Sequence, residues 1–189
     1  MNTEAAKVGD SVSATLGNVT EKPHSKNVWA SNVHVVVRDA DGNVKHKESG
    51  ENLVTDYGDD MLATRTILDS TNIVTGMRLG TSTTVAAKAG AGAAIVTYIS
   101  GSNEALDSAA GEATKGAGAG WRTTYVCTWV AGDVTNSAIA EVVLTNETPL
   151  TSVAGAVGNT VARYKFASTI DKQAGDSLEV TWNIDFLGA

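Results

Sequence analysis

The carboxyl-terminal part of the chain alternates apolar and polar residues with a period of two. From Leu178 to Phe186 every second side chain is large and apolar, and the side chains between them are polar. Successive side chains of a strand point to opposite faces, so this pattern predicts a strand with one buried face. A second strand is expected over 161–170. Residues 171–176 between them favour pairing of the two strands as antiparallel neighbours.

The same patterns predict a hairpin near the start of the body. Strands over 33–38 and 43–48 flank the turn Asp39–Gly42, where Gly42 is free to adopt a positive φ. Further strands are expected over 74–80, 121–130 and 138–145, and also over 93–99, where a helix is the alternative for so short a run. In the strand 121–130, Cys127 shares one face with the aromatic residues Tyr125 and Trp129.

One short segment has helical spacing instead. Thr55 or Asp56 is a suitable helix cap, and acidic Asp59 and Asp60 follow in the first turn, where the helix dipole favours negative charge. Helical spacing is shared by four residues downstream: Met61, Leu62, Arg65 and Leu68. A helix that covers one end or edge of the sheets is therefore predicted.

About eight short strands with one short helix indicate the all-β class. The predicted architecture is an antiparallel β-sandwich, jelly-roll-like, over residues 28–189. Residues 1–27 are predicted to form an extended N-terminal arm, because their few apolar residues lie among Gly, Ser, Thr and Lys and bury too little to fold alone. Residues 101–120, rich in small side chains, and 146–159 are predicted to be loops.

Composition and charge narrow the possible partners. The 189 residues carry a formal net charge of −7, which disfavours nucleic acid as a partner. The basic clusters at 22–26 and 45–47 are interpreted as solvated charge. No apolar run approaches the roughly 20 residues that span a bilayer, so no membrane is expected, and the N-terminal residues lack a secretory pattern, so folding in a cytoplasm is expected.

The residues that could act as nucleophiles, acids, bases or metal ligands do not match the spacing of a known catalytic or metal-binding motif. The single Cys127 permits no internal disulfide and is interpreted as a small buried hydrophobe. The turn 39–43 resembles the start of a calcium loop but lacks the downstream Glu, and Asp59 with Asp60 suits a helix start. The carboxylates considered as a glycosidase-like pair are Asp176, Glu179 and Asp185. We predict no catalytic, metal-binding or cofactor-binding residue, and no cofactor.

Several stretches resemble small virion structural proteins of tailed bacteriophages. They are 51–62 (strand into short helix), 77–84, 140–147, 161–166 and the closing 176–186, so the resemblance covers about residues 51–187 with gaps. Val142 and Val143 stand where the family often has Ala-Gly. The resemblance implies a virion location, assembly in the host cytoplasm, and a structural role, since none of these motifs is catalytic.

The resulting expectation is a non-enzymatic capsid decoration (cement) protein, or alternatively a neck, tail or fibre-base protein. Its expected partners are copies of itself, in a symmetric homo-oligomer such as a trimer, and the major capsid protein or neck and tail proteins. The arm and the two loops would make the contacts. A carbohydrate-binding or adhesin module is an alternative, with Trp29 and Trp121 as the candidate sugar platform. An enzyme such as a glycan hydrolase is a third reading.

Overall fold

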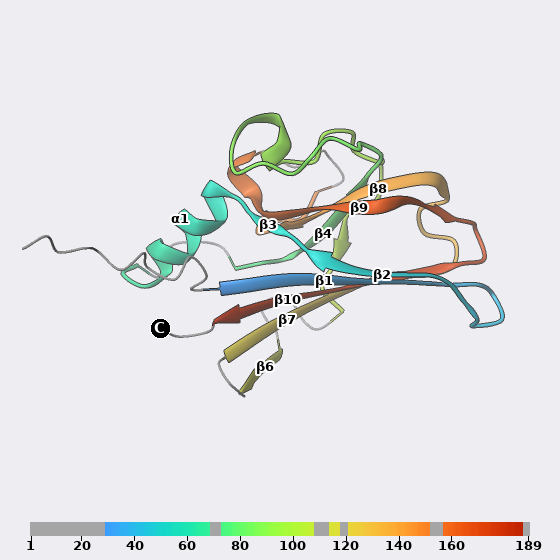
Figure 1. The fold of residues 1–189 in the computed structure, drawn as a ribbon, viewed down its shortest axis with the longest axis horizontal. Coiled ribbons are helices and arrows are strands. Elements are labelled where there is room, and N and C mark those ends of the chain that lie inside the picture. The colour runs from blue at the N-terminus through green and yellow to red at the C-terminus, as the bar shows by residue number, and fades with distance from the viewer. Residues whose placement is uncertain (1–28, 69–72, 108–113, 118–120, 152–156, 187–189) are drawn as a thin grey trace, which may run out of the picture.

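The computed structural model describes residues 29–68, 73–107, 114–117, 121–151 and 157–186, which form two antiparallel five-stranded sheets packed face to face (Figure 1). Sheet A has the order β2 (Val44–Glu51), β1 (Trp29–Arg38), β10 (Ser177–Phe186), β7 (Trp121–Trp129) and β6 (Thr114–Ala117). Sheet B has the order β3 (Leu53–Val54), β9 (Thr160–Lys172), β8 (Asn136–Thr145), β4 (Gly76–Gly80) and β5 (Glu104–Ala105). The predicted antiparallel β-sandwich is confirmed.

The hydrophobic core lies between the two sheets, on the faces that the alternating patterns mark as apolar. Sheet A contributes Val33, Val35, Val37, Cys127, Trp129, Leu178, Val180, Trp182 and Ile184. Sheet B contributes Met77, Leu79, Val142, Leu144, Tyr164, Phe166 and Ile170. Trp129 and Trp182 are completely buried, and their indole N–H groups donate to the Ser102 carbonyl (2.9 Å) and the Ser31 hydroxyl (3.2 Å). The core thus buries its largest side chains with their polar atoms satisfied.

The hairpin and the helix are confirmed. β1 and β2 are antiparallel, and Gly42 in the turn between them has φ +84°. Helix α1 (Asp56–Arg65) begins after Thr55, whose hydroxyl accepts from the Gly58 N–H at 3.0 Å. Met61 is buried, whereas Leu68 lies beyond the helix and is exposed. The helix packs on β9 and β3 at one end of the sandwich (Figure 1).

The pairing predicted for the last two strands is wrong. β9 lies in sheet B between β3 and β8, and β10 lies in sheet A between β1 and β7. The turn 173–176 therefore crosses between the sheets. At this crossing the buried Lys172 ammonium donates to the Val130 carbonyl (3.1 Å) and the Asp133 carbonyl (2.5 Å). The two apolar faces meet across the core instead of side by side in one sheet.

Two loop and strand predictions also need correction. Residues 93–99 do not form a strand; after the short 3-10 helix η1 (Gly90–Ala93) the chain is irregular, with one isolated bridge between Tyr98 and Gly80. Conversely, the segment predicted as the loop 101–120 contains β5 and β6, and its Ser102 and Leu106 are buried. These two short strands and β3 raise the strand count above the predicted eight.

Other predictions fall on residues that the structure does not describe. The arm 1–27 lies outside the described residues, as do 108–113 and 118–120 of the predicted loop 101–120 and 152–156 of the loop 146–159. A second 3-10 helix, η2 (Val157–Asn159), leads into β9. Among the described helices, none combines the length and apolar character needed to cross a membrane.

Candidate interaction surface

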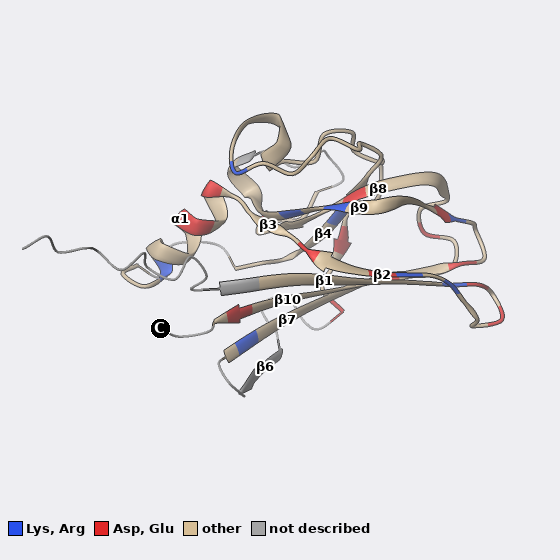
Figure 2. Ribbon diagram, in the orientation of Figure 1, with Lys and Arg blue, Asp and Glu red and all other residues tan. Residues whose placement is uncertain are grey.

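The outer faces of the two sheets differ in what covers them. On sheet B, the strand register turns Arg78, Glu141, Val143 and Arg163 away from the core, yet all four side chains are completely buried. The segment 81–97 lies across this face (Figure 1). Figure 2 shows the resulting placement of charged residues within the strands of sheet B as well as in the loops.

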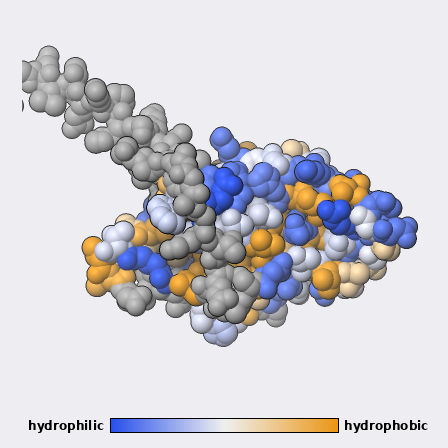
Figure 3. Space-filling view, turned by 90° about the horizontal axis from the view of Figure 1, so that it is seen from below, coloured by the Kyte–Doolittle hydropathy of each residue, from blue (hydrophilic) through white to orange (hydrophobic). Residues whose placement is uncertain are grey.

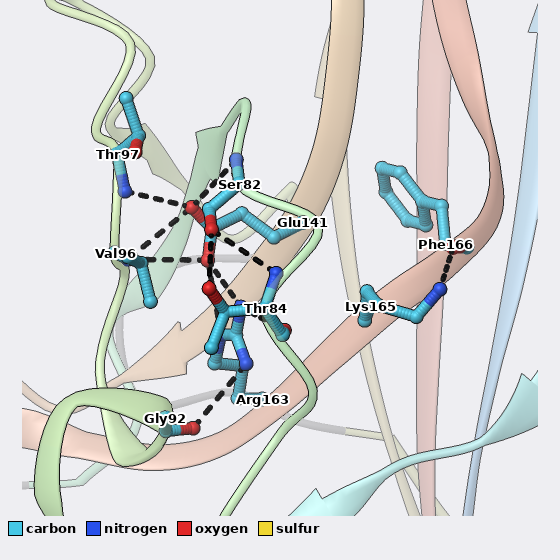
Figure 4. A network of polar contacts seen from close by, with 9 residues as sticks. All are labelled: Ser82, Thr84, Gly92, Val96, Thr97, Glu141, Arg163, Lys165 and Phe166. Carbon is cyan, nitrogen blue, oxygen red and sulfur yellow. Dashed lines mark hydrogen bonds and ion pairs between the residues drawn. The ribbon is translucent and has the colours of Figure 1, made fainter.

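Glu141 holds this segment against the sheet through backbone donors. Its carboxylate accepts from the N–H groups of Ser82 (3.2 Å), Val96 (3.2 Å) and Thr97 (2.9 Å) (Figure 4). The N–H groups of residues 96 and 97 therefore donate to a side chain and are not used in backbone hydrogen bonds to a neighbouring strand, as the predicted strand would require. A buried carboxylate that accepts several N–H bonds replaces the hydration that it has lost.

Arg163 completes the network on the neighbouring strand. Its guanidinium lies 2.8–2.9 Å from the Glu141 carboxylate and also donates to the carbonyls of Thr84 (2.8 Å) and Gly92 (3.3 Å) (Figure 4). Both charges are buried, paired and hydrogen-bonded, which is the condition under which buried charges are tolerated. The outer face of sheet B is therefore closed by the chain itself.

Sheet A presents the opposite situation. The outward side chains of β2, β1, β10 and β7 are mostly short polar and β-branched residues, and, apart from the buried Asn183, they are half-buried or exposed. Figure 3 views the molecule from this side and shows hydrophilic and hydrophobic residues interspersed where the surface is not grey. One row across the strands is hydrogen-bonded: Thr124 donates to the Asn183 amide oxygen (2.8 Å), and the Asn183 amide nitrogen donates to Asn32 (3.1 Å). Such a ladder fixes the side chains of a sheet in place.

The next two rows of this face carry one histidine, one glutamate and one lysine among smaller side chains. The register places Val126, Thr181, His34 and Ser49 in one row, and Thr128, Glu179, Val36 and Lys47 in the other. His34 Nδ1 and the Ser49 hydroxyl are 2.8 Å apart. We call these three rows, residues 32, 34, 36, 47, 49, 51, 124, 126, 128, 179, 181 and 183, the sheet A face.

Ion pairs lie at both ends of this face. Arg122 donates to the Asp185 carboxylate through two nitrogens, at 2.6 and 2.9 Å, and the hydrogen bond from Arg122 lowers the pKa of Asp185. At the far end Lys45 donates to Asp176 at 2.6 Å, and the Lys45 hydrogen bond, followed by the Gln173 N–H, lowers the pKa of Asp176. Both carboxylates are thus committed to cationic partners.

The positions considered as candidate chemistry are dispersed. Asp176 precedes β10 and Asp185 lies near its end, about 30 Å away at the rise of a strand. A glycosidase pair requires separations below about 10 Å, so these two do not form one. The Asp39 carboxylate accepts from the backbone N–H groups of Asp41 and Asn43 inside the hairpin turn.

Cys127 is buried as predicted. Its Sγ lies 3.3 Å from the Ala105 carbonyl, and burial raises the pKa of the thiol. Within the described part of the chain, no three His, Cys, Asp or Glu side chains gather in a way that could hold a metal ion. The His46 Nε2 and the Glu48 carboxylate are 3.1 Å apart.

The aromatic candidates for a sugar platform sit at one end of sheet A. Trp121 is 56% exposed, and the register places it beside Phe186, which is 36% exposed. Phe186 is in turn in register with Trp29, whose side chain lies outside the described set. In the alternation of each strand, all three positions belong to the set that faces the core. They lie at the end of the sheet where β1 begins and β10 ends.

The buried charges on sheet B were missed from the sequence. Glu141 stands within the otherwise apolar run Ala140–Leu144, and Arg78 stands between Met77 and Leu79. A charge inside an apolar strand pattern is the available signal, because such a residue must find a partner if both faces are buried. The pattern does not identify that partner, and Arg163 comes from a strand 22 residues away.

The comparisons with known proteins return no relatives. No protein-family model matches the chain, and neither a curated protein nor a solved structure matches it.

Proposed function

We propose that this chain is a non-enzymatic structural protein of tailed-bacteriophage particles, a capsid decoration (cement) protein that binds the particle surface. The observation that carries the proposal is the asymmetry of the sandwich. Glu141 and Arg163 close sheet B beneath the chain's own 81–97 segment, whereas the outward side chains of sheet A, apart from Asn183, are half-buried or exposed and include a hydrogen-bonded row. A surface whose side chains are held in place by such a row suits docking against another protein surface.

The resemblance of residues 51–187 to virion proteins supports the same proposal. It suggests assembly in the host cytoplasm with the major capsid protein as partner, and a neck, tail or fibre-base position as the alternative location. The net charge of −7 and the sheet A face, which lacks a basic cluster, favour a protein partner over nucleic acid.

A matched pair of substitutions tests whether the sheet A face makes the contact. Thr181 lies at the centre of that face, whereas the exposed Thr97 lies in the segment over sheet B. Thr181→Lys introduces a charge into the proposed interface and should reduce co-sedimentation with phage particles at least tenfold. Thr97→Lys adds the same charge on the opposite side and should leave co-sedimentation unchanged. Equal effects of the two variants, or no co-sedimentation by the unsubstituted chain, would contradict the proposal.

A carbohydrate-binding module is a second candidate because one observation favours it. Trp121 and Phe186 place two exposed aromatic side chains next to each other, as sugar-binding surfaces require. Under this alternative, glycan-array binding would be lost in Trp121→Ala and kept in Val130→Ala, which alters an exposed apolar residue just beyond the other end of β7. No binding to any glycan by the unsubstituted protein would remove this candidate.

A further inference from the structure

Exposed apolar side chains gather at one end of the sandwich, between α1 and the end of sheet A. Five of the nine large apolar residues that are exposed in the described chain belong to this end. They are Ile67 (78% exposed), Leu68 (56%), Ile73 (38%), Trp121 and Phe186. Figure 3 shows hydrophobic residues at the α1 end of the view, as well as at other places on this side of the molecule. Clustered exposure of this kind marks an interaction site more often than scattered apolar residues do.

A pocket lies within this apolar end, and we call it the α1 groove. It is lined by Met61, Leu62, Ile73, Val74, Leu106 and Tyr125, with Arg65 beside them. Burial raises the pKa of the Tyr125 hydroxyl to about 12, in keeping with an apolar setting. The pocket volume is about 150 Å³. That is below the roughly 300 Å³ at which small-molecule sites begin, so the groove suits inserted apolar side chains.

The N-terminal segment reaches the body at this same end. β1 begins at Trp29, which pairs with Phe186, and β1 then runs away from the groove toward the hairpin. Residues 1–28 are therefore joined to the described part of the chain at this end. Leu16 is 13 residues before Trp29, so an extended segment places Leu16 up to about 43 Å from the body, far enough to reach another copy.

The sequence of this segment contains regularly spaced apolar side chains of the kind that the groove could accept. Val8, Val12 and Leu16 recur at intervals of four. An interval of four keeps residues on one face in a strand and nearly on one face in a helix. The segment thus offers one apolar face in either conformation, with polar residues such as Ser11 and Ser13 on the other sides.

From these observations we infer that the α1 groove binds residues 8–16 of the N-terminal segment of a second copy of this chain. The inference rests on the proposed assembly function and names one contact within it. Segment and groove are different surfaces, so the contact is heterologous and can close into a ring, such as a trimer. Binding in this way covers apolar area on both partners without enlarging either core.

Disulfide cross-linking of the full chain tests the inference without any phage particle. Two single variants, Leu16→Cys and Ile73→Cys, are mixed in equal amounts and oxidised; the native Cys127 is completely buried and serves as an inert background. The expected result is a covalent dimer on a non-reducing gel. In the control mixture, Leu16→Cys is combined with Val44→Cys, at a residue that is 51% exposed where β2 begins, and the dimer should be at least tenfold less abundant.

Two outcomes would overturn the inference. One is equal cross-linking in the two mixtures. The other is a doubly substituted Leu16→Cys/Ile73→Cys chain that cross-links only within itself, because the segment would then occupy its own groove. Particle binding without interchain cross-linking would remove this contact and leave the proposed function standing. Cross-linking without particle binding would support this contact and contradict the proposed function.

Discussion

Glu141 and Arg163 lie side by side on sheet B, and neither side chain is exposed to solvent. Each carries several hydrogen bonds to the segment 81–97, so the pair links the sheet to its covering segment. A buried pair of this kind contributes little net stability over an apolar pair, but the loss of one partner leaves the other charge unpaired. The network therefore fixes which face of the sandwich is closed.

A substitution at Glu141 measures this effect. Glu141→Gln removes the negative charge and leaves the Arg163 guanidinium buried, which should lower the free energy of unfolding by about 3–5 kcal/mol. Glu179→Gln, on the exposed face of sheet A, should change it by less than about 0.5 kcal/mol. Urea unfolding gives both values. A loss below about 1 kcal/mol for Glu141→Gln would mean that the remaining carbonyl acceptors suffice for Arg163.

The ion pairs at the two ends of sheet A predict a dependence of stability on acid. Hydrogen bonds from Lys45 and Arg122 lower the pKa values of Asp176 and Asp185 in the folded state. Their stabilisation is therefore fully present above the ordinary aspartate pKa of about 3.9 and is lost as pH falls through the lowered folded values. The urea concentration at the midpoint of unfolding should therefore decrease when the pH is lowered below about 4.

Removing one aspartate isolates its share of this acid dependence. Asp176→Asn should flatten the dependence of the urea midpoint on pH below about pH 4. Lys45→Met should act in the same direction, because Lys45 is the largest cause of the shift at Asp176. An acid dependence that is identical in the parent and both variants would show that this ion pair does not contribute to it.

At the scale of elements, α1 is fixed to the sheet by a close backbone approach. Gly58 lies so near β9 that a Cβ there would collide with the Val161 carbonyl oxygen. Gly→Ala inside a helix usually stabilises by about 0.4–1 kcal/mol. Gly58→Ala should instead destabilise by about 1–3 kcal/mol, because the helix must shift. Thermal unfolding decides between the two signs, and a higher Tm in Gly58→Ala would contradict this packing.

The elements that depend on local signals were predictable from the sequence. The hairpin around Gly42 and the helix capped by Thr55 both form where turn and capping residues indicate them. The alternation over 178–186 correctly identified the buried face of β10. Alternation does not say which strand lies alongside, so the predicted pairing of 161–170 with 178–186 failed.

Two further differences have a common physical reason. Val96 and Thr97 donate their N–H groups to Glu141, and Ser102 offers its carbonyl to the Trp129 indole. Both contacts are long-range and join polar backbone to a buried side chain. A local pattern contains no information on such partners, so the sequence indicated a strand over 93–99 and a loop at Ser102. The same limit hid the Glu141–Arg163 pair.

At the scale of the whole molecule, the sandwich has one closed face, one partly exposed face and one apolar end. The closed face follows from the buried charges of sheet B. The partly exposed face belongs to β2, β1, β10 and β7, and the apolar end lies where β1 begins. Under the proposed function, the sheet A face contacts the particle and the apolar end contacts a second copy. The two surfaces would then act together in assembly.

Electron microscopy of phage particles purified from the source of this sequence can examine this arrangement in a single map. We predict that the sandwich occurs in repeated, symmetry-related positions on the particle surface. The sheet A face, with Thr181 at its centre, should lie against the underlying protein, and the segment 81–97 should face outward. Purified particles that lack this chain, or a map in which the sheet A face points into solvent, would contradict the proposed role.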